Sequence, residues 1–355
     1  MLKVLRHFPV DGEPLSSVRY GSGHINQTYL VTTNAPHLYI FQRINQRVFT
    51  DIPALMRNIH AVTQYLTSKD PDPRHVLTLL PAEDGRPYYT DDEGECWRLY
   101  EFVTGGITLD RAESPDDFYQ SAIAFGGFQT MLADFAAETL HETIPHFHDT
   151  PARFRAFHAA VSADAAGRRR LAEREIAIAL EHEHEAAFLM NLLASGELPL
   201  RVTHNDTKLN NVILDAHDRK ALCVIDLDTV MPGLVANDFG DSIRFGANTA
   251  AEDETDLGKV SLSLPLYEAY ARGFLEMCGS RLTELEIATL PMGAKLMTLE
   301  NGVRFLTDYL QGDPYYAVAR PDHNLDRART QFALVQDMER KWERMNKIVA
   351  AHRKA

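Results

Sequence analysis

The sequence has few cysteines and no long apolar run. Its 355 residues include only three cysteines, Cys96, Cys223 and Cys278, which lie too far apart to suggest a disulfide framework or a set of metal ligands. No stretch approaches 18 uncharged apolar residues, and the opening segment MLKVLRHFPVDGEP lacks the apolar core of a signal peptide. We therefore expect a reduced, cytoplasmic protein that does not cross a membrane.

Basic residues are scarce relative to acidic ones. Thirty-six Lys and Arg against 50 Asp and Glu give a formal net charge of −14, which disfavours nucleic acid or an anionic membrane surface as the main partner. Any phosphate group that the protein binds therefore needs a local cluster of cations or a metal ion. The composition, 45 % hydrophobic and 24 % charged, is that of a folded chain long enough for two domains.

The first hundred or so residues carry strand patterns around a single helix. β-rich runs at 18–20, 28–33, 38–44, 75–82 and 96–103 predict five strands, and the glycine-containing segment GSGHINQ at 21–27 forms a turn between the first two. Residues 51–68 place apolar side chains at helical spacing, with Asp51 as the N-cap and Pro53 in the first turn. We predict an N-terminal lobe over residues 1–105, with a five-stranded sheet and one helix.

The pattern becomes helical after the glycine pair at 105–106. Long helical patterns occupy 116–135 and 167–194, and nearly everything after residue 260 is helical. Only residues 199–230 break this pattern, with short β-rich runs at 212–214 and 222–225. We therefore predict an α+β fold whose second lobe, residues 106–355, is mainly helical.

The β-rich segment at 199–230 contains the residues best suited to chemistry. His204, Asp206 and Asn211 have the spacing H-x-D-x-x-x-x-N, and Asp226 follows a strand run. Phosphoryl transfer needs such groups, because a carboxylate must face the attacking hydroxyl while amide and carboxylate oxygens bind Mg²⁺. Lys208, two residues after Asp206, is placed to stabilise charge on the γ-phosphate. The alternative is a hairpin rich in Asp and Asn whose side chains only cap turns.

The same motifs resemble a known enzyme group. HNDTKLNN at 204–211 and IDLDT at 225–229 resemble the aminoglycoside phosphotransferase superfamily, small-molecule relatives of protein kinases. Within it the chain is most similar to N-acetylhexosamine 1-kinases, in segments at 21–31, 39–45, 204–211, 226–233, 237–248 and 300–316. The resemblance implies a bilobal protein-kinase-like fold with ATP between the lobes. It also implies transfer of the ATP γ-phosphate to the anomeric hydroxyl of N-acetylglucosamine or N-acetylgalactosamine.

The resemblance also implies roles for individual residues. Asp206 becomes the catalytic base, and Asn211 and Asp226 become the Mg²⁺ ligands. We expect Asp238 to brace the catalytic loop, and Asp228 either to orient the loop or to serve as a second metal ligand. The residues implied to contact the sugar are His24, Asp206, Arg304 and Tyr315.

The expected nucleotide contacts lie in the N-terminal lobe. The turn with Gly21 and Gly23 is a candidate phosphate loop, although Asn26 stands where a third glycine is usual. Protein kinases place a lysine on the third strand, where this chain has Arg43. Its guanidinium can grip phosphate oxygens by two parallel hydrogen bonds and needs no partner to stay charged, so Arg43 can replace that lysine. A surface arginine is the alternative. Backbone groups from Glu101 to Val103 are expected to contact adenine.

Three other functions remain open at this point. A kinase of the same fold could act on another sugar, on homoserine or on an amino alcohol, because only the acceptor pocket would differ. A pseudokinase that senses sugar or nucleotide is disfavoured because Asp206, Asn211 and Asp226 are all present, and a protein kinase because no activation segment separates Asp226 from Asp238. We expect ATP, Mg²⁺ and a small-molecule sugar as ligands, and a monomeric enzyme.

Overall fold

The computed structural model describes residues 2–21 and 25–353, which form two compact units. The N-terminal unit comprises residues 1–108, 131–145 and 211–232, and the C-terminal unit comprises residues 109–130, 146–210 and 233–355. The sequence predicted a boundary at 105/106, and that division stays a prediction. The structure adds two later segments to the N-terminal unit, including the one with Asn211 and Asp226.

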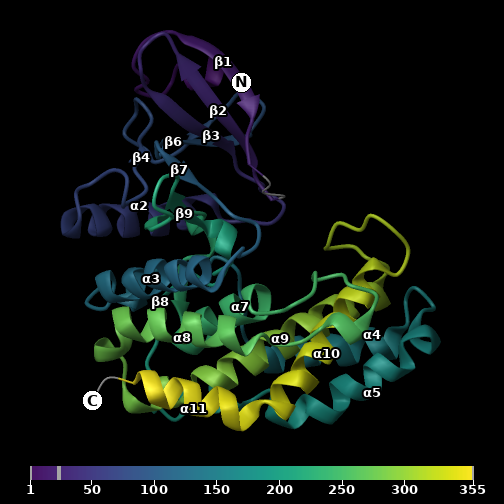
Figure 1. Ribbon diagram of the computed structural model, residues 1–355. Coiled ribbons are helices and arrows are strands. Elements are labelled where there is room, and N and C mark those ends of the chain that lie inside the picture. Colours follow the sequence, from purple (N-terminus) through teal and green to yellow (C-terminus); the bar gives the residue numbers. More distant parts are fainter. Residues whose placement is uncertain (1, 22–24, 354–355) are drawn as a thin grey trace. The chain divides into compact units, whose positions relative to one another are not determined.

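The main sheet of the N-terminal unit is antiparallel, and its strands differ in length (Figure 1). Six strands take part, in the order β1-β2-β3-β6-β4, with β5 paired to β6. The sheet therefore has one strand more than predicted, because a two-residue strand forms beside β6. The strands are β1 (Pro14–Arg19), β2 (Gln27–Thr33), β3 (Leu38–Arg43), β4 (Leu79–Leu80), β5 (Tyr89–Thr90) and β6 (Cys96–Glu101).

The two faces of this sheet differ in chemistry. Phe41 pairs with Leu99 and Arg43 with Trp97 in the β3–β6 register, and Phe41, Trp97 and Leu99 belong to an apolar cluster that also takes in residues of the N-terminal segment. Gln42 pairs with Arg98 in the same register, so these two side chains lie on the opposite face. Arg43 and Gln42, although adjacent in sequence, therefore point to different sides.

The helix predicted at 51–68 is present as α2 (Ile52–Lys69). The carboxylate of Asp51 accepts a hydrogen bond from the Ala54 amide at 2.9 Å, and Pro53 lies in the first turn, as predicted. A second, three-stranded sheet has the order β10-β9-β7. Its strands are β7 (Gly106–Ile107), β9 (Val212–Asp215) and β10 (Ala221–Val224), and a short helix α1 (Leu2–Leu5) starts the chain.

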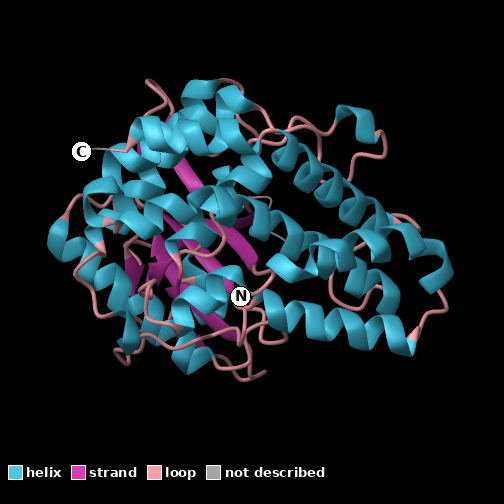
Figure 2. Ribbon diagram, turned by 90° about the horizontal axis from the view of Figure 1, so that it is seen from below, coloured by secondary structure: helices cyan, strands magenta, loops and turns pink. Residues whose placement is uncertain are grey.

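The C-terminal unit is mostly helical (Figure 2). Its long central helix α9 packs against α4, α7 and α10. None of the helices in the described residues combines the length and apolar character needed to span a lipid bilayer. The helices are α3 (Pro115–Met131), α4 (Thr150–Ala163), α5 (Glu173–His182), α6 (Phe188–Ala194), α7 (Val235–Gly246), α8 (Leu264–Cys278), α9 (Glu284–Gln311), α10 (His323–Arg340) and α11 (Trp342–His352), with the short strand β8 (Arg201–Thr203). The short strand β11 (Met231–Gly233) begins in the last residues of the N-terminal unit and ends at the first residue of the 233–355 segment of the C-terminal unit.

Two glycines allow α7 to lie very close to α9. A Cβ atom at Gly240 would meet the Gly293 carbonyl oxygen at 2.3 Å, and one at Gly293 would meet the Ala236 carbonyl oxygen at 2.1 Å. Larger side chains at these positions would push the helices apart. The close contact holds α7, which carries several polar residues discussed below, firmly against the core helix. The β-sheet and helical parts together confirm the predicted α+β fold with a β-rich and a mainly helical part.

Candidate active site

Backbone hydrogen bonds to Asp238 hold the loop that follows β8. The Asp238 carboxylate on α7 accepts bonds from the His204 amide at 2.9 Å, the Asn205 amide at 2.7 Å and the Gln129 side chain at 2.8 Å. Asn205 has a left-handed backbone with φ 65°, which such bonds can maintain. Burial raises the pKa of Asp238, and the hydrogen bonds that it accepts oppose this shift. The prediction that Asp238 braces the loop is confirmed.

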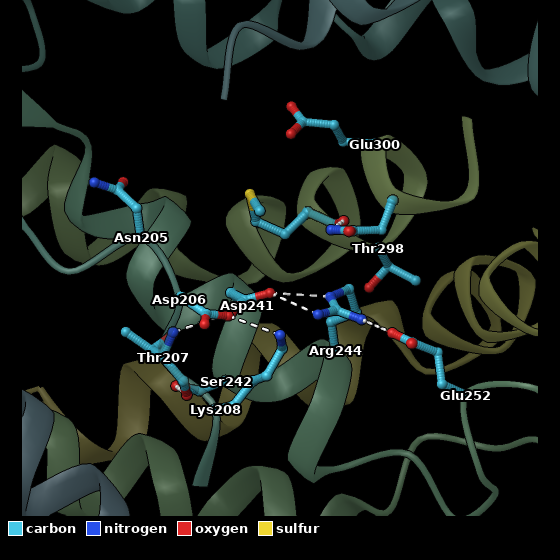
Figure 3. A network of polar contacts seen from close by, with 12 residues as sticks. Asn205, Asp206, Thr207, Lys208, Asp241, Ser242, Arg244, Glu252, Thr298 and Glu300 are labelled. Atoms are coloured by element: carbon cyan, nitrogen blue, oxygen red, sulfur yellow. Dashed lines mark hydrogen bonds and ion pairs between the residues drawn. The ribbon is translucent and has the colours of Figure 1, made fainter. Parts of the chain in front are cut away.

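A second carboxylate of α7 fixes the next residue of the loop (Figure 3). The Thr207 amide donates to Asp241 at 3.0 Å, and the other Asp241 oxygen accepts from Arg244 Nε at 3.0 Å and Nη2 at 2.8 Å. Arg244 also donates through Nη1 to Glu252 at 2.7 Å. Arg244 is 3 % exposed, so two carboxylates balance its buried charge.

Asp206 and Lys208 form an ion pair within this braced loop. Lys208 Nζ lies 2.9 Å from an Asp206 carboxylate oxygen, and the two side chains are 33 and 29 % exposed. The charge of Asp206 raises the pKa of Lys208 against the effect of burial, and Asp241 adds to the increase. Lys208 therefore stays protonated, and both groups remain accessible to a reactant. Figure 3 shows them extending from the loop toward each other.

A buried glutamate of α9 reaches the same loop through a histidine. Glu300 is fully buried, accepts from Thr150 at 2.7 Å and lies 2.9 Å from Nδ1 of His148. The other ring nitrogen of His148 lies 3.2 Å from the Asn205 carbonyl oxygen, next to Asp206 in the chain. Burial favours the neutral acid, but the hydrogen bond and charge of His148 outweigh it and lower the pKa of Glu300.

One turn after Glu300, Arg304 lies among aromatic rings. Its guanidinium carbon is 5.4 Å from the Phe147 ring and 5.8 Å from the Tyr316 ring, in cation–π geometry. Burial, and then the charge of Arg304, lower the pKa of Arg153. Tyr315 is 58 % exposed. In the structure Tyr316 contacts Arg304, and the sugar contact expected of Tyr315 stays a prediction.

The two expected metal ligands lie at one end of a hairpin in the N-terminal unit. Val212 pairs with Val224 in the β9–β10 register, and the Ile225 amide donates to the Asn211 carbonyl oxygen at 2.9 Å. Asn211 therefore precedes β9 at the end where Asp226 follows β10. Asp226 is exposed and has a left-handed backbone with φ 60°. A magnesium ion that also binds phosphates needs only one or two protein oxygens, and this amide and carboxylate fit that need.

A buried ion pair holds the segment after Asp226. Arg98 on β6 is 1 % exposed and pairs with Asp228, which also accepts from Asn26. Arg98 Nε donates to Gln42 at 2.9 Å. Burial disfavours the guanidinium charge, yet Asp228 outweighs it and raises the pKa of Arg98. Of the two roles left open for Asp228, the contacts support orientation of the loop.

The remaining nucleotide contacts stay predictions. Arg43 lies 3.4 Å from Glu95 on the sheet face opposite Arg98, and its proposed contact with phosphate stays a prediction. The Glu101 amide donates to the Thr78 carbonyl oxygen at 3.0 Å, so it is not available to adenine. Contacts of adenine with the Glu101 carbonyl and with the buried Val103 stay predictions. Gly21 has a left-handed φ of 75° in an open position. The two other turn residues called from the sequence, Gly23 and His24, lie outside the described residues.

Comparison with a family model identifies the class of enzyme. The model described as "Phosphotransferase enzyme family" matches residues 17–277, nearly three quarters of the chain and all of the segments with the Asp206 and Asp226 motifs. The chain belongs to this phosphotransferase family. It is thus an enzyme that transfers phosphoryl groups, as predicted, and ATP with a divalent cation is the cofactor set of its family.

Solved structures share the fold of this phosphotransferase at low sequence identity. A microcompartment-associated aminopropanol kinase matches with a TM-score of 0.64 at 18 % identity, covering 97 % of each chain. An aminoglycoside phosphotransferase from Alicyclobacillus acidocaldarius matches with a TM-score of 0.66 at 13 % identity, covering 99 % of this chain and 96 % of that one. An amicoumacin kinase in complex with AMP-PNP and Ca²⁺ matches with a TM-score of 0.62 at 14 % identity, covering 96 and 92 %. These matches confirm the kinase-like fold.

Several polar residues of the phosphotransferase escaped the sequence analysis. Arg98 lies between Trp97 and Leu99 in the mostly apolar run CWRLYEFV, and a charge flanked by large apolar residues on a predicted strand is a usable signal of a buried ion pair. Glu300 is a comparable case, because it lies within a mostly apolar helical segment that also contains Arg304. His148 carried no such signal, since its partner Glu300 lies 152 residues away. Arg244 has one partner three residues away, Asp241, and a second one eight residues away, Glu252.

Proposed function

We propose that this phosphotransferase is an anomeric sugar kinase. It transfers the ATP γ-phosphate to the C1 hydroxyl of an N-acetylhexosamine and releases the 1-phosphate. The proposal combines the family with the sequence resemblance to N-acetylhexosamine 1-kinases. The observation that carries the choice of acceptor is the environment of Arg304, next to the braced loop with Asp206.

Asp206 and Lys208 perform the chemistry in this proposal. Asp206 orients the sugar hydroxyl and accepts its proton, and an anomeric hydroxyl is acidic enough for a carboxylate of ordinary pKa to serve. Lys208 keeps its positive charge beside Asp206 and stabilises negative charge on the phosphate. Asn211 and Asp226 would hold Mg²⁺, which neutralises the charge of the triphosphate when it is bound.

The surroundings of Arg304 favour a neutral acceptor over a cationic one. Arg304 and Arg153 lie near each other, and Glu300, a buried carboxylate that acts on both, is already paired with His148 and Thr150. An ammonium group would meet two guanidinium groups and no open carboxylate among these residues. Hydroxyl and acetamido oxygens, in contrast, accept hydrogen bonds from arginine.

The solved structures favour a second candidate, a kinase of amino alcohols. Besides the aminopropanol kinase, an ethanolamine kinase from Plasmodium vivax and a choline kinase from Cryptosporidium parvum share the fold, with TM-scores of 0.55 and 0.58 at 14 and 12 % identity. Their acceptors carry an amine or quaternary ammonium group. Charge at the acceptor site therefore separates the two candidates.

A coupled ATP-consumption assay tests the proposal. The panel contains N-acetylglucosamine, N-acetylgalactosamine, glucosamine, glucose, aminopropanol, choline and homoserine, and phosphorus NMR locates the phosphate on C1 or C6 of any sugar product. We expect turnover of an N-acetylhexosamine with phosphate on C1. Turnover of aminopropanol or choline alone, or phosphate on C6, would overturn the proposal.

An arginine variant checks the reason for the choice of acceptor. Arg304→Met should raise the KM for the N-acetylhexosamine about tenfold or more, because a hydrogen bond from a charged donor is lost, while the KM for ATP stays the same. Arg272→Met is the matched control, since Arg272 also stacks on an aromatic ring, at 4.3 Å from that of Tyr119 on α3. An unchanged sugar KM in Arg304→Met would remove Arg304 from the acceptor site.

A further inference from the structure

A cavity of about 230 Å³ lies beside the catalytic loop, within the C-terminal unit. It is bordered by the segment 110–112, by Leu209 just after the loop, by the end of α7, by residues 248 and 250–252, and by Gln331 on α10. None of the residues predicted to contact the sugar lines it. At about 30 Å³ for each water molecule, the volume suits a substituent of several heavy atoms.

Gln331 lines this cavity and has a buried hydrogen-bond acceptor without a partner among the described residues. The residue is 1 % exposed, and within residues 2–21 and 25–353 its Oε1 has no hydrogen-bond partner. A buried amide oxygen without a partner costs free energy, which a ligand with an N–H or O–H group recovers on binding. The cavity is therefore suited to a hydrogen-bond donor.

The charged groups of the cavity are already balanced. Arg244 donates to Asp241 and Glu252, and Arg111 donates through Nη2 to the Thr249 carbonyl oxygen at 2.6 Å. The lining also includes Asp110, so its two carboxylates, Asp110 and Glu252, cancel the formal charge of its two arginines. The net charge of the cavity therefore favours neither a cationic nor an anionic ligand. An uncharged group with a hydroxyl or amide N–H fits better.

The cavity is also connected to the catalytic loop. Arg244 lines it and binds Asp241, whose other oxygen accepts from the Thr207 amide next to Asp206. Figure 3 shows this chain of contacts running from Glu252 through Arg244 and Asp241 to the loop. In addition, Lys208 Nζ lies 5.9 Å from the ring of Phe245, another lining residue. A group in the cavity is thus placed near the reacting end of the acceptor.

We propose that this cavity is a specificity subsite that binds an uncharged, hydrogen-bond-donating substituent of the acceptor, with Gln331 Oε1 as the acceptor of that bond. The substituent is a ring hydroxyl, a hydroxymethyl group or an acetamido N–H. This inference rests on the proposed kinase function and deepens it. In this proposal Gln331 contacts the acceptor substrate and has no role in ATP binding.

Two variants test the subsite from different directions. Gln331→Leu removes the accepting oxygen with little change in volume, and Ala250→Phe fills the cavity. Each variant should raise the KM for the acceptor substrate about tenfold or more and weaken acceptor binding in calorimetry to the same extent. Gln331→Leu leaves the hydrogen-bond donor of the acceptor substrate unpaired, and Ala250→Phe excludes that group from the cavity. The KM for ATP should not change. Gln336→Leu is the matched control, because Gln336 lies on the same helix and does not line the cavity.

The outcomes separate the subsite from the proposed function. Turnover of an N-acetylhexosamine with unaltered acceptor KM in both variants would overturn the subsite alone. Turnover of another neutral sugar, weakened tenfold in Gln331→Leu, would overturn the proposed substrate and support the subsite. Turnover restricted to aminopropanol or choline would overturn both. Folding of the variants is checked by thermal unfolding, and the unchanged KM for ATP provides the internal control.

Discussion

Loss of the buried ion pair in the N-terminal unit should destabilise that unit strongly. Arg98→Met keeps much of the side-chain volume but leaves the Asp228 carboxylate, 3 % exposed, with the Asn26 amide as its remaining hydrogen-bond donor among the contacts described above. Removing one partner of a buried pair costs about 3–5 kcal/mol, because the other charge stays buried without compensation. With a urea dependence of about 2 kcal/mol/M, the unfolding midpoint should fall by roughly 2 M.

Tryptophan fluorescence offers an assay specific to this unit. The chain has two tryptophans, Trp97 on β6 and Trp342 on α11, one in each unit. In a Trp342→Phe background the remaining signal comes from Trp97, which is 6 % exposed, stacks on Phe41 and neighbours Arg98. Urea unfolding of this background with and without Arg98→Met measures the change in free energy where the pair is located.

A double variant distinguishes the loss of a pair from the loss of packing. Arg98→Met with Asp228→Leu replaces both charges by apolar groups, which is often neutral or even stabilising in other buried pairs. We expect the double variant to recover most of the stability. A midpoint change below about 0.5 M in Arg98→Met, or a double variant as unstable as the single one, would refute the assignment of an uncompensated buried charge.

Three further predictions concern the site. Asp206→Asn should lower kcat by about 10²–10⁴ with ATP affinity retained, and near wild-type turnover would remove its assignment as the base. Asn211→Ala should raise the Mg²⁺ concentration needed for half-maximal rate at least severalfold, whereas the neighbouring Asn210→Ala should not; equal curves would contradict the ligand assignment. The pKa of Glu300 is lowered from its ordinary value of 4.5, so the unfolded chain binds that proton first as pH falls. The stability that comes from its contact with His148 should therefore be lost as pH falls through about 4.5 and below. The unfolding free energy of Glu300→Gln should fall less steeply with pH over that interval than that of the unaltered protein. Equal slopes for the two proteins would refute the lowered pKa.

Local sequence patterns predicted the secondary structure of the N-terminal region well. The helix at 51–68 was predictable because its N-cap, its proline and its apolar spacing all lie within one short segment. The ends of the helices in the second half of the chain were harder to predict. The predicted helix at 167–194 is broken into α5, α6 and short 3₁₀ turns, which local backbone bonds close, such as that from the Ala186 amide to the Glu183 carbonyl oxygen. Strand β5 was missed because two residues carry no periodicity.

The spacing of Asp206, Lys208 and Asn211, and the family that it indicates, could be read from one short stretch of chain, because these residues are neighbours in sequence. Contacts between residues that are far apart in the sequence could not be predicted in this way. Arg98 with Asp228, Glu300 with His148, and the position of Gln331 beside Arg244 depend on how separate helices and strands pack. The charged partners of Arg98 and Glu300 shift the pKa of each against the effect of burial. Which distant side chains meet in the interior is a property of the folded chain that no local pattern contains.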